Sequence, residues 1–396
     1  MSLSFCIIVK NEEKNLPKCL ASVQDIVDEI IVLDTGSSDR TPEIAKDFGA
    51  KVYHFQWCND FAIARNESLK YVTGDWILIL DADEFLAPEI KPQLLKAIQQ
   101  DENHLVINLI RQEVGATQSP YSLVSRLFRR HPEIYFTRPY HAMIDDSVTE
   151  ILKRESHWLI GSLSDIAILH EGYQTGTILA KNKREKAKES MEKFLVKNPN
   201  DAYKCSKLGA LYVEEGNLSK GIYLLEKGLK NKEIDPLVLY ELNYHLGIAY
   251  SHKQKWDKVK NHYLTATAID ILPTLKLGAY NNLGNLYKNE GDLAAAEILY
   301  KTMLQIDPNF AIAYYNLGMT LKAMGHLSDA IALYQEAIRL NPEYAEAYQN
   351  LGVVFYKLGR VTESLDAFKT AIKLYEKYHS TEAERLRQGL RNMGLM

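Results

Sequence analysis

Two aspartates, Asp81 and Asp83, are the residues of this chain whose type and spacing best suit chemistry. They follow the apolar run of residues 76–80, and a continuous apolar run that ends at a turn predicts a buried strand of a parallel sheet. In open α/β sheets, ligands bind beyond the carboxyl ends of the strands. Mg²⁺ or Mn²⁺ usually takes one or two carboxylates together with phosphate oxygens of a substrate. The pair therefore predicts a divalent-cation site, with a simple charged turn before Pro88 as the alternative.

Polar residues follow two other apolar runs at the corresponding point. Residues 3–9 lead to Asn11 and Glu12, and residues 29–33 lead to Asp34. Because the carboxyl ends of parallel strands meet at one edge of a sheet, we expect these side chains to share a crevice with the aspartate pair.

Helical segments separate these runs, which is the pattern of an α/β domain with a parallel, doubly wound sheet. Thr41 and Pro42 are suited to open one of the helices, and Gly49 is suited to end it. The predicted strands are residues 3–9, 29–33, 51–55 and 76–80, and the predicted helices are residues 16–27, 41–48 and 60–71. Two further strands are expected at residues 105–110 and 123–128.

Composition excludes several classes of protein. The 396 residues suffice for about two or three domains, and the net charge of -4 argues against a nucleic-acid binder. No apolar run approaches the roughly 18 residues of a transmembrane segment. The four cysteines lack metal-type spacing and the first strand lacks a basic leader, so we expect a cytoplasmic protein without disulfides. Glycine-rich dinucleotide motifs, a P-loop and a nucleophile elbow are missing as well.

Four motifs in order resemble the family 2 glycosyltransferases of the GT-A fold. The resemblance covers roughly residues 1–175 and is closest to the branch that contains lipopolysaccharide-core glucosyltransferases and peptide S-glycosyltransferases. The motifs are Ile8-Val9-Lys10-Asn11-Glu12, residues 31–41 (IVLDTGSSDRT), residues 61–66 (FAIARN) and residues 74–84 (GDWILILDADE).

The resemblance implies inverting transfer of a hexose from a nucleotide-diphosphate sugar, usually UDP-linked, with Mn²⁺ or Mg²⁺. A divalent cation would stabilise the charge that develops on the departing diphosphate. Asp34 would contact the nucleobase, Glu12 the ribose and Arg65 the nucleotide or diphosphate. Asp34 as a turn cap and Arg65 as a partner of a neighbouring acid are the alternatives. The implied donor-binding residues are Val9, Asn11, Glu12, Asp34, Arg65 and Asp81, and the metal pair is Asp81 and Asp83.

The general base that inversion requires is open. Relatives usually carry a His-Glu pair after an aromatic-containing strand, whereas this chain has His141 followed by Ala142. His141, Asp145 and Asp146 are the candidates.

His170 is a further candidate metal ligand. An apolar run delivers it to the turn that begins Glu171-Gly172-Tyr173, which resembles the His-x-Gly-Tyr segment that closes this domain in relatives. Mn²⁺ accepts an imidazole beside carboxylates. A hydrogen-bonded histidine at a domain seam is the alternative.

The second half of the chain is a repeat array. Leu-Gly pairs recur there, the last two intervals measure 34 residues, and an aromatic residue or leucine follows each pair at a fixed distance. This pattern is typical of tetratricopeptide repeats, which are helix–turn–helix units that stack into a superhelix. The pairs begin at Leu208, Leu246, Leu283, Leu317 and Leu351.

Asn282, Asn316 and Asn350 recur at 34-residue spacing, each just before its Leu-Gly pair. An amide offers both a donor and an acceptor, so such a ladder suits binding of a peptide backbone of a protein partner. A similar ladder occurs in the protein O-GlcNAc transferase. The alternative is that asparagine is simply the usual residue at this repeat position.

The predicted domains are a GT-A domain at residues 1–175, a connecting helix at 176–200, five repeats at 201–378 and a capping helix at 379–396. The preferred hypothesis is a glycosyltransferase whose array recruits an acceptor or partner. The competing hypothesis is an interaction scaffold with an inactive nucleotide-binding head, which Ala142 favours. A nucleotidyltransferase is less favoured because the first strand lacks a glycine-rich phosphate loop.

Overall fold

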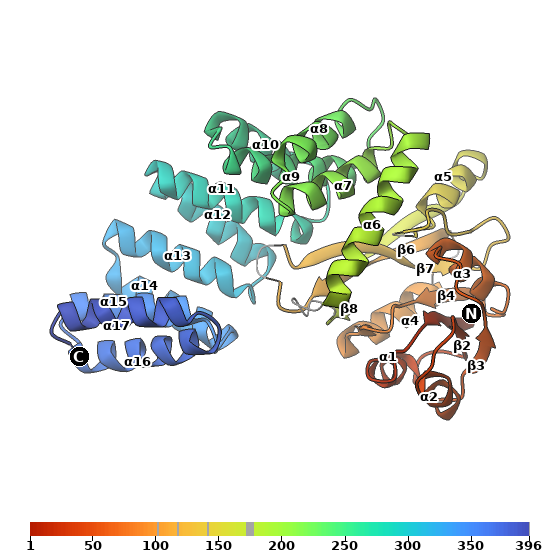
Figure 1. Ribbon diagram of the computed structural model, residues 1–396, viewed down its shortest axis with the longest axis horizontal. Helices are drawn as coiled ribbons and strands as arrows, with labels where there is room; N and C mark the ends of the chain where they lie inside the picture. The colour runs from red at the N-terminus through yellow and green to blue at the C-terminus, as the bar shows by residue number, and fades with distance from the viewer. Residues whose placement is uncertain (101–102, 117–118, 141, 172–177, 396) are drawn as a thin grey trace. The chain divides into compact units, whose positions relative to one another are not determined.

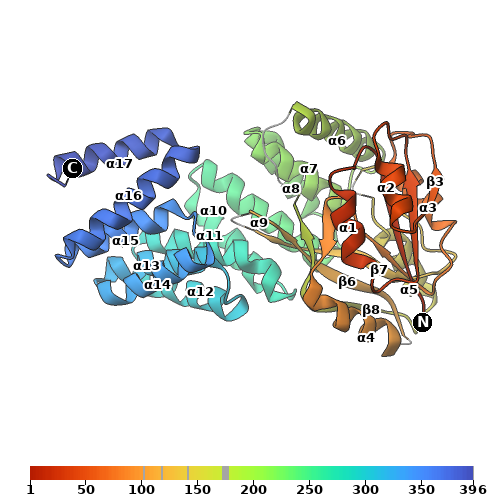
Figure 2. The same ribbon diagram turned by 90° about the horizontal axis from the view of Figure 1, so that it is seen from below.

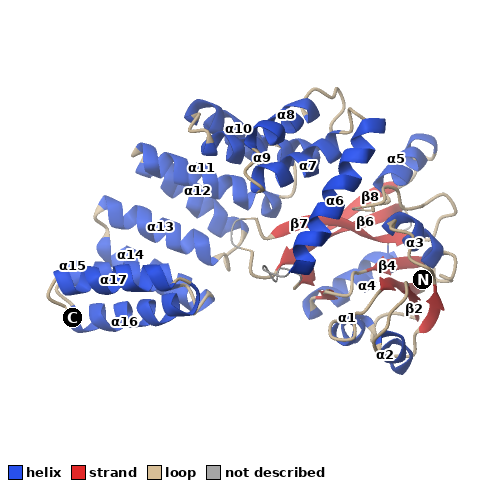
Figure 3. Ribbon diagram, in the orientation of Figure 1, coloured by secondary structure: helices blue, strands red, loops and turns tan. Residues whose placement is uncertain are grey.

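The computed structural model describes residues 1–100, 103–116, 119–140, 142–171 and 178–395. They form two compact units, which meet in the sequence between Lys204 and Cys205. All the described strands lie in the first unit, and the second unit consists of helices (Figure 3). The fold class expected from the sequence, an α/β domain followed by an all-helical repeat array, is confirmed.

One mixed sheet organises the first unit. Its strands are β1 (Leu3–Val9), β2 (Glu29–Asp34), β3 (Lys51–His54), β4 (Trp76–Ile79), β5 (Glu84–Leu86), β6 (His104–Glu113), β7 (Tyr121–Arg129) and β8 (Leu159–His170). Their order is β3-β2-β1-β4-β7-β6-β8-β5. The first four strands are parallel, as predicted, whereas β7 is antiparallel to β4 and β6, and β5 is antiparallel to β8. The parallel sheet is therefore only part of the whole sheet.

Helices cover both faces of this sheet (Figure 1). On one face, Phe5 and Ile7 of β1 join a core with residues of α1 (Leu16–Val23), α2 (Thr41–Asp47) and α4 (Lys91–Gln100). On the other face, Cys6 joins a core with residues of α3 (Phe61–Leu69) and α5 (Asp145–Arg154). This alternation follows from the two-residue period of a strand, whose successive side chains point to opposite faces.

Strand register brings the polar ends of the strands together. Val9 at the end of β1 pairs with Asp34 at the end of β2. The short strand β5 sets Glu84 opposite His170, and the pairing of β6 with β8 sets Glu113 opposite the same histidine. The segment after β4 is thereby tied to β8, although almost ninety residues separate them in the sequence.

Paired helices build the array, and Figure 2 shows the pairs from a second direction. After α6 (Ile178–Lys197), the helices follow one another in the pairs α7/α8, α9/α10, α11/α12, α13/α14 and α15/α16, and α17 (Ser380–Asn392) comes last. Their bounds are α7 (Ala202–Glu214), α8 (Leu218–Gly228), α9 (Pro236–His252), α10 (Trp256–Ala268), α11 (Leu277–Glu290), α12 (Leu293–Ile306), α13 (Ala311–Met324), α14 (Leu327–Leu340), α15 (Ala345–Lys357) and α16 (Val361–Tyr378).

The glycines of the Leu-Gly pairs lie against a side chain of the second helix of the same pair. A Cβ atom on Gly284 would lie 2.8 Å from the ring of Tyr300, and one on Gly318 would lie 2.8 Å from the ring of Tyr334. Glycine is therefore required for the helices to pack at this distance.

None of the helices in the described part of the chain has both the length and the apolar sequence of a membrane span.

Candidate active site

Asp81 is held between two arginines. Its Oδ1 accepts a hydrogen bond from Nη2 of Arg65 at 2.6 Å, and its Oδ2 accepts one from Nη2 of Arg126 at 2.7 Å. The two guanidinium groups come from α3 and β7 and are almost completely buried. Burial alone would raise the pKa of Asp81, but the charges of Arg126 and Arg65 hold it well below its usual range. Both carboxylate oxygens of Asp81 are thus bound by arginines.

Glu84 extends this ion-pair network into the sheet. It is completely buried, and its Oε1 accepts a hydrogen bond from Nη1 of Arg111 at 2.9 Å. Its Oε2 accepts the backbone N–H of Asp81 at 2.9 Å, which fixes the turn after β4. Nη2 of Arg111 lies 2.7 Å from Glu113. Buried and partly buried charges of both signs therefore alternate from Asp81 to Glu113, and each buried charge has a partner of opposite sign.

Asp83 contacts a histidine instead of an arginine. Its Oδ2 lies 3.2 Å from Nε2 of His170, whose Nδ1 is hydrogen-bonded to Glu113. Burial would lower the pKa of His170, but Asp83 and Glu113 together raise it to about 10. The sequence predicted that Asp83 and His170 would lie together, and the structure places them in contact. It adds Glu113 as the second partner of the histidine.

Asp34 closes the end of β2 with its own turn. Its carboxylate accepts the backbone N–H groups of Gly36 at 3.3 Å and of Ser37 at 3.1 Å. The side chain is nearly buried, and Nδ1 of His54 lies 3.3 Å from Oδ2. Asp34 therefore caps this turn, and its role toward a nucleobase stays a prediction.

The end of β1 is tied to the same turn. The carbonyl of Val9 accepts the N–H of Thr35 at 2.9 Å. Asn11 has a positive φ of 57°, and its Oδ1 accepts the N–H of Ser38 at 2.8 Å. The N–H of Glu12 donates to Oγ1 of Thr41 at 2.8 Å. These bonds set the implied donor-binding residues of β1 beside Asp34.

The candidates for the general base lie in different surroundings. His141 lies outside the described residues. Asp145 accepts a hydrogen bond from Oγ of Ser125 at 2.9 Å, and burial raises its pKa. Asp146 instead binds Arg138 through both oxygens, at 2.9 and 3.0 Å. Asp146 is therefore held in a bidentate pair with an arginine, whereas Asp145 is hydrogen-bonded to a serine hydroxyl.

The asparagines of the repeat ladder bond mainly to other side chains of the array. Nδ2 of Asn316 donates to Oδ1 of Asn281 at 2.8 Å, and Nδ2 of Asn282 donates to the hydroxyl of Tyr263 at 3.2 Å. Asn350 accepts a hydrogen bond from Nζ of Lys322 at 2.6 Å. The ladder therefore links neighbouring repeats, and its role in peptide binding stays a prediction.

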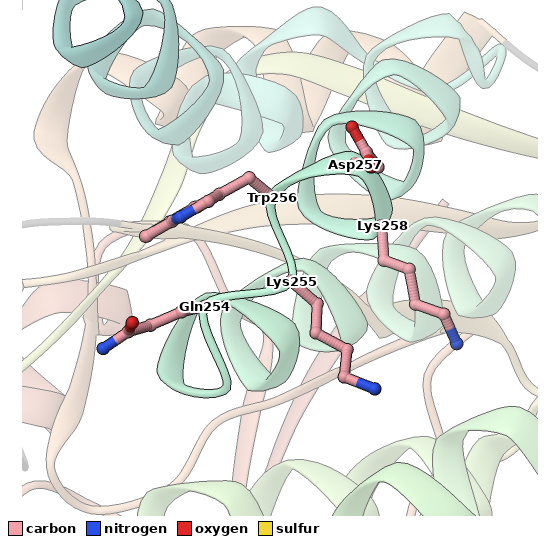
Figure 4. Close-up of a pocket in the computed structure, with 5 residues that line it drawn as sticks. All are labelled: Gln254, Lys255, Trp256, Asp257 and Lys258. Carbon is pink, nitrogen blue, oxygen red and sulfur yellow. The ribbon is translucent and has the colours of Figure 1, made fainter.

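A hollow of about 420 Å³ lies at the turn between α9 and α10. Its lining is one continuous segment, from Gln254 to Lys258, in which the Lys255 and Lys258 side chains extend in a similar direction (Figure 4). Trp256 is 51% exposed there. None of the candidate site residues lines this hollow.

Comparison with known proteins agrees with the geometry of both units. Residues 4–161 match the model of the glycosyl transferase family 2. Tetratricopeptide repeat models match residues 277–310, 299–332, 320–359 and 345–378. The helix pairs α7/α8 and α9/α10 lie before residue 277, and that they are two further repeats stays a prediction.

Relatives share one or both parts of the chain. A TPR repeat-containing protein of Synechococcus elongatus is 44% identical over 294 residues, which are 74% of this chain and 73% of that protein. The glycosyltransferase SunS of Bacillus subtilis is 30% identical over 198 residues, which span 49% of this chain and 45% of SunS. The solved TPR protein YrrB is 19% identical with a TM-score of 0.38 and covers 51% of this chain and 100% of that structure.

The chain therefore carries a family 2 glycosyltransferase domain at its N-terminus, joined to tetratricopeptide repeats. Its N-terminal unit is a glycosyltransferase domain of GT-A type.

Proposed function

We propose that the chain transfers a hexose with inversion from a UDP-sugar to an acceptor, with the help of Mn²⁺ or Mg²⁺. The observation that carries this proposal is the row of Asp83, His170 and Glu113 beside the arginine-bound Asp81. Asp83 lies in the turn after β4, and Glu113 and His170 are the last residues of β6 and β8. Such a row suits recognition of a metal-bound diphosphate, because it presents a carboxylate and an imidazole next to buried guanidinium groups.

The side chains divide into those that fit a divalent cation and those that do not. Within the described residues, no group of three or more His, Cys, Asp or Glu side chains is arranged to hold a metal ion. Asp81 is neutralised by its arginines. Asp83 and, after loss of its extra ring proton, His170 would hold the cation together with donor phosphate oxygens, and Glu113 would orient the imidazole, as carboxylates do behind metal-bound histidines. When bound, the cation supplies Lewis-acid stabilisation of the leaving diphosphate.

The protein's own groups would perform the other tasks. Asp34 would accept a hydrogen bond from the base of the nucleotide, and its fixed turn would set the register of the donor. Arg65 and Arg126 would keep Asp81 ionised and in place beneath the diphosphate. Asp145 would accept the acceptor's proton, because a carboxylate with a raised pKa is the better general base near neutral pH.

The array would recruit a protein or peptide through the face that carries Asn282, Asn316 and Asn350. We also propose that the protein acts in the cytoplasm. In support, all four cysteines are free thiols, and three of them are buried.

A screen of UDP-sugars with and without Mn²⁺ tests the proposal. Thermal shift would identify the donor, and release of UDP would measure its turnover. We expect one UDP-sugar to stabilise the protein in the presence of Mn²⁺ and to be turned over. Binding without turnover for every sugar would instead support the scaffold hypothesis that Ala142 favours. No stabilisation by millimolar UDP with metal would exclude both.

A further inference from the structure

The loop of residues 136–140 is bound from one side by α3. The N–H of Phe61 donates to the carbonyl of Pro139 at 3.0 Å. Asn66 exchanges two hydrogen bonds with the backbone of Phe136, at 2.9 and 2.7 Å. These contacts join the loop to the helix that carries Arg65.

Arg65 itself touches the same region. Its Nη1 donates to the carbonyl of Ala142 at 3.4 Å, and its guanidinium lies 5.2 Å from the ring centre of Phe136. Arg65 also holds Asp81. The position of the loop is therefore coupled by direct contacts to the centre of the candidate active site.

Two residues at the start of α7 also bind the loop: Asp201 just before the helix and Lys204 in its first turn. Lys204 is 1% exposed, and its Nζ donates to the carbonyl of Tyr140 at 2.7 Å. Oδ2 of Asp201 lies 3.3 Å from Nη2 of Arg138. Both Asp201 and Lys204 belong to the first compact unit, although Lys204 lies in the first turn of the first repeat helix.

The backbone of the loop is strained where these contacts converge. Arg138 has a φ of 72°, in the left-handed region that residues with side chains rarely adopt. Such a conformation persists only where the surrounding contacts over-determine it. A lysine ammonium is likewise buried only where it gains a strong acceptor. Two unfavourable features that meet at one loop indicate that its position is maintained for a purpose other than simple packing.

We infer that Asp201 and Lys204 are positioning residues for glycosyl transfer. They hold the loop of residues 136–140 against α3, and through it they fix Arg65 and the turn that carries Asp81. The inference rests on the proposed function and adds to it that the transferase domain needs the first residues of α7. The repeat array thus begins inside the catalytic unit in sequence.

Replacement of one lysine tests the inference in the full-length chain. Lys204→Met keeps the length of the side chain but removes the donor to Tyr140. Lys207→Met is the matched control, because Lys207 lies one turn further along α7 and pairs with Glu241 at 2.6 Å. Lys204→Arg is the rescue variant. The measurements are hydrogen–deuterium exchange of peptides from residues 134–140, UDP binding stoichiometry by calorimetry, and UDP release from the donor sugar.

We expect Lys204→Met to speed exchange in these peptides about tenfold, the effect of losing one hydrogen bond to a charged group. Turnover per UDP-binding site should fall about 10- to 100-fold, because small displacements of positioning groups have effects of this size. The stoichiometry of UDP binding should stay unchanged, which separates mispositioning from loss of folded protein. Lys207→Met should resemble the wild type, and Lys204→Arg should recover most of the turnover.

Equal exchange and equal turnover in Lys204→Met and Lys207→Met would overturn the inference. If the wild type turns over no UDP-sugar, the proposed function fails, while the exchange of the loop still decides whether Lys204 holds it. Should Lys204→Met not fold, Asp201→Asn takes its place. That variant keeps the oxygen that accepts the N–H of Lys204 at 2.7 Å and removes the charge that faces Arg138.

Discussion

The two compact units stabilise their interiors by different means. In the transferase unit, Arg65, Arg126 and Glu84 are buried and held by partners of opposite charge. In the array, the recurring contact is steric, between a glycine of one helix and an aromatic ring of the next, as for Gly318 and Tyr334. We infer that the two units tolerate different substitutions. The stability of the first unit should depend most on the charge of its buried side chains, and that of the second on their volume.

Asp83 is a charged residue of the first unit whose side chain is partly exposed. Its loss should therefore lower turnover and leave the fold intact. Asp83→Ala should lower UDP-sugar turnover about a thousand-fold, because metal-assisted stabilisation of a leaving group is worth several kcal/mol. UDP release and differential scanning fluorimetry would be measured side by side. A variant that keeps more than about a tenth of the turnover would remove Asp83 from the metal site.

Arg126 is buried, so its replacement should lower the stability of the protein by a large amount, unlike that of Asp83. Arg126→Met leaves Asp81 and Glu84 with one cation fewer, and breaking a buried ion pair costs about 3–5 kcal/mol. Arg154→Met is the control, because Arg154 pairs with Glu133 at the surface and such pairs contribute about 1 kcal/mol or less. Urea unfolding gives both values. Equal destabilisation of the two variants would contradict the view that buried charge governs the first unit.

Local patterns made most of the fold predictable. The strand at residues 76–80 and its alternating neighbours follow from continuous apolar runs, and the repeats that the family models match at residues 277–378 follow from the spacing of Leu-Gly pairs. The candidate site was predictable only in part. Asp34, Asp81, Asp83 and His170 were recognisable because each ends an apolar run.

The partners of these residues had no comparable signal. Arg126 lies on β7, which pairs with β4, and Arg111 and Glu113 lie on β6, which pairs in parallel with β8. These strand pairs bring the three residues to the site from distant parts of the sequence. A three-residue strand, β5, supplies Glu84, and so short a run has no recognisable period. Contacts of this kind depend on strand register, which a single sequence does not define.

In the array, the sensitive variable should be volume. Gly318→Ala places a methyl group 2.8 Å from the ring of Tyr334 and should destabilise the protein by about 1–3 kcal/mol, the range for overpacking. Gly389→Ala on α17 is the matched control, because its added Cβ would meet no atom within 4 Å. That control should gain up to about 1 kcal/mol from helix propensity. Urea unfolding distinguishes them, and a neutral Gly318→Ala would refute the steric interpretation of the Leu-Gly pairs.

The smallest expected effect is the protonation of His245 in the array, because we expect charge to contribute least to stability there. Burial lowers the pKa of His245 to about 4. Two charged residues face the same imidazole: Glu241 acts to raise this pKa, and Lys207 acts to lower it. The folded state therefore favours the neutral ring. The stabilisation is complete above the unfolded pKa of about 6.5 and is lost as the pH falls toward 4.

Between pH 7.5 and pH 6.0 this histidine should cost the protein a little under about 1 kcal/mol, because the unfolded chain binds the proton first. The pH dependence of urea unfolding should be correspondingly flatter in His245→Asn. His326→Asn is the control substitution, at a histidine of the array whose side chain is 60% exposed. If His245→Asn kept the full pH dependence of the wild type, the ring would be solvated in the folded array. If lowering the pH from 7.5 to 6.0 cost the protein more stability through His245 than Gly318→Ala does, charge would govern the interior of both units.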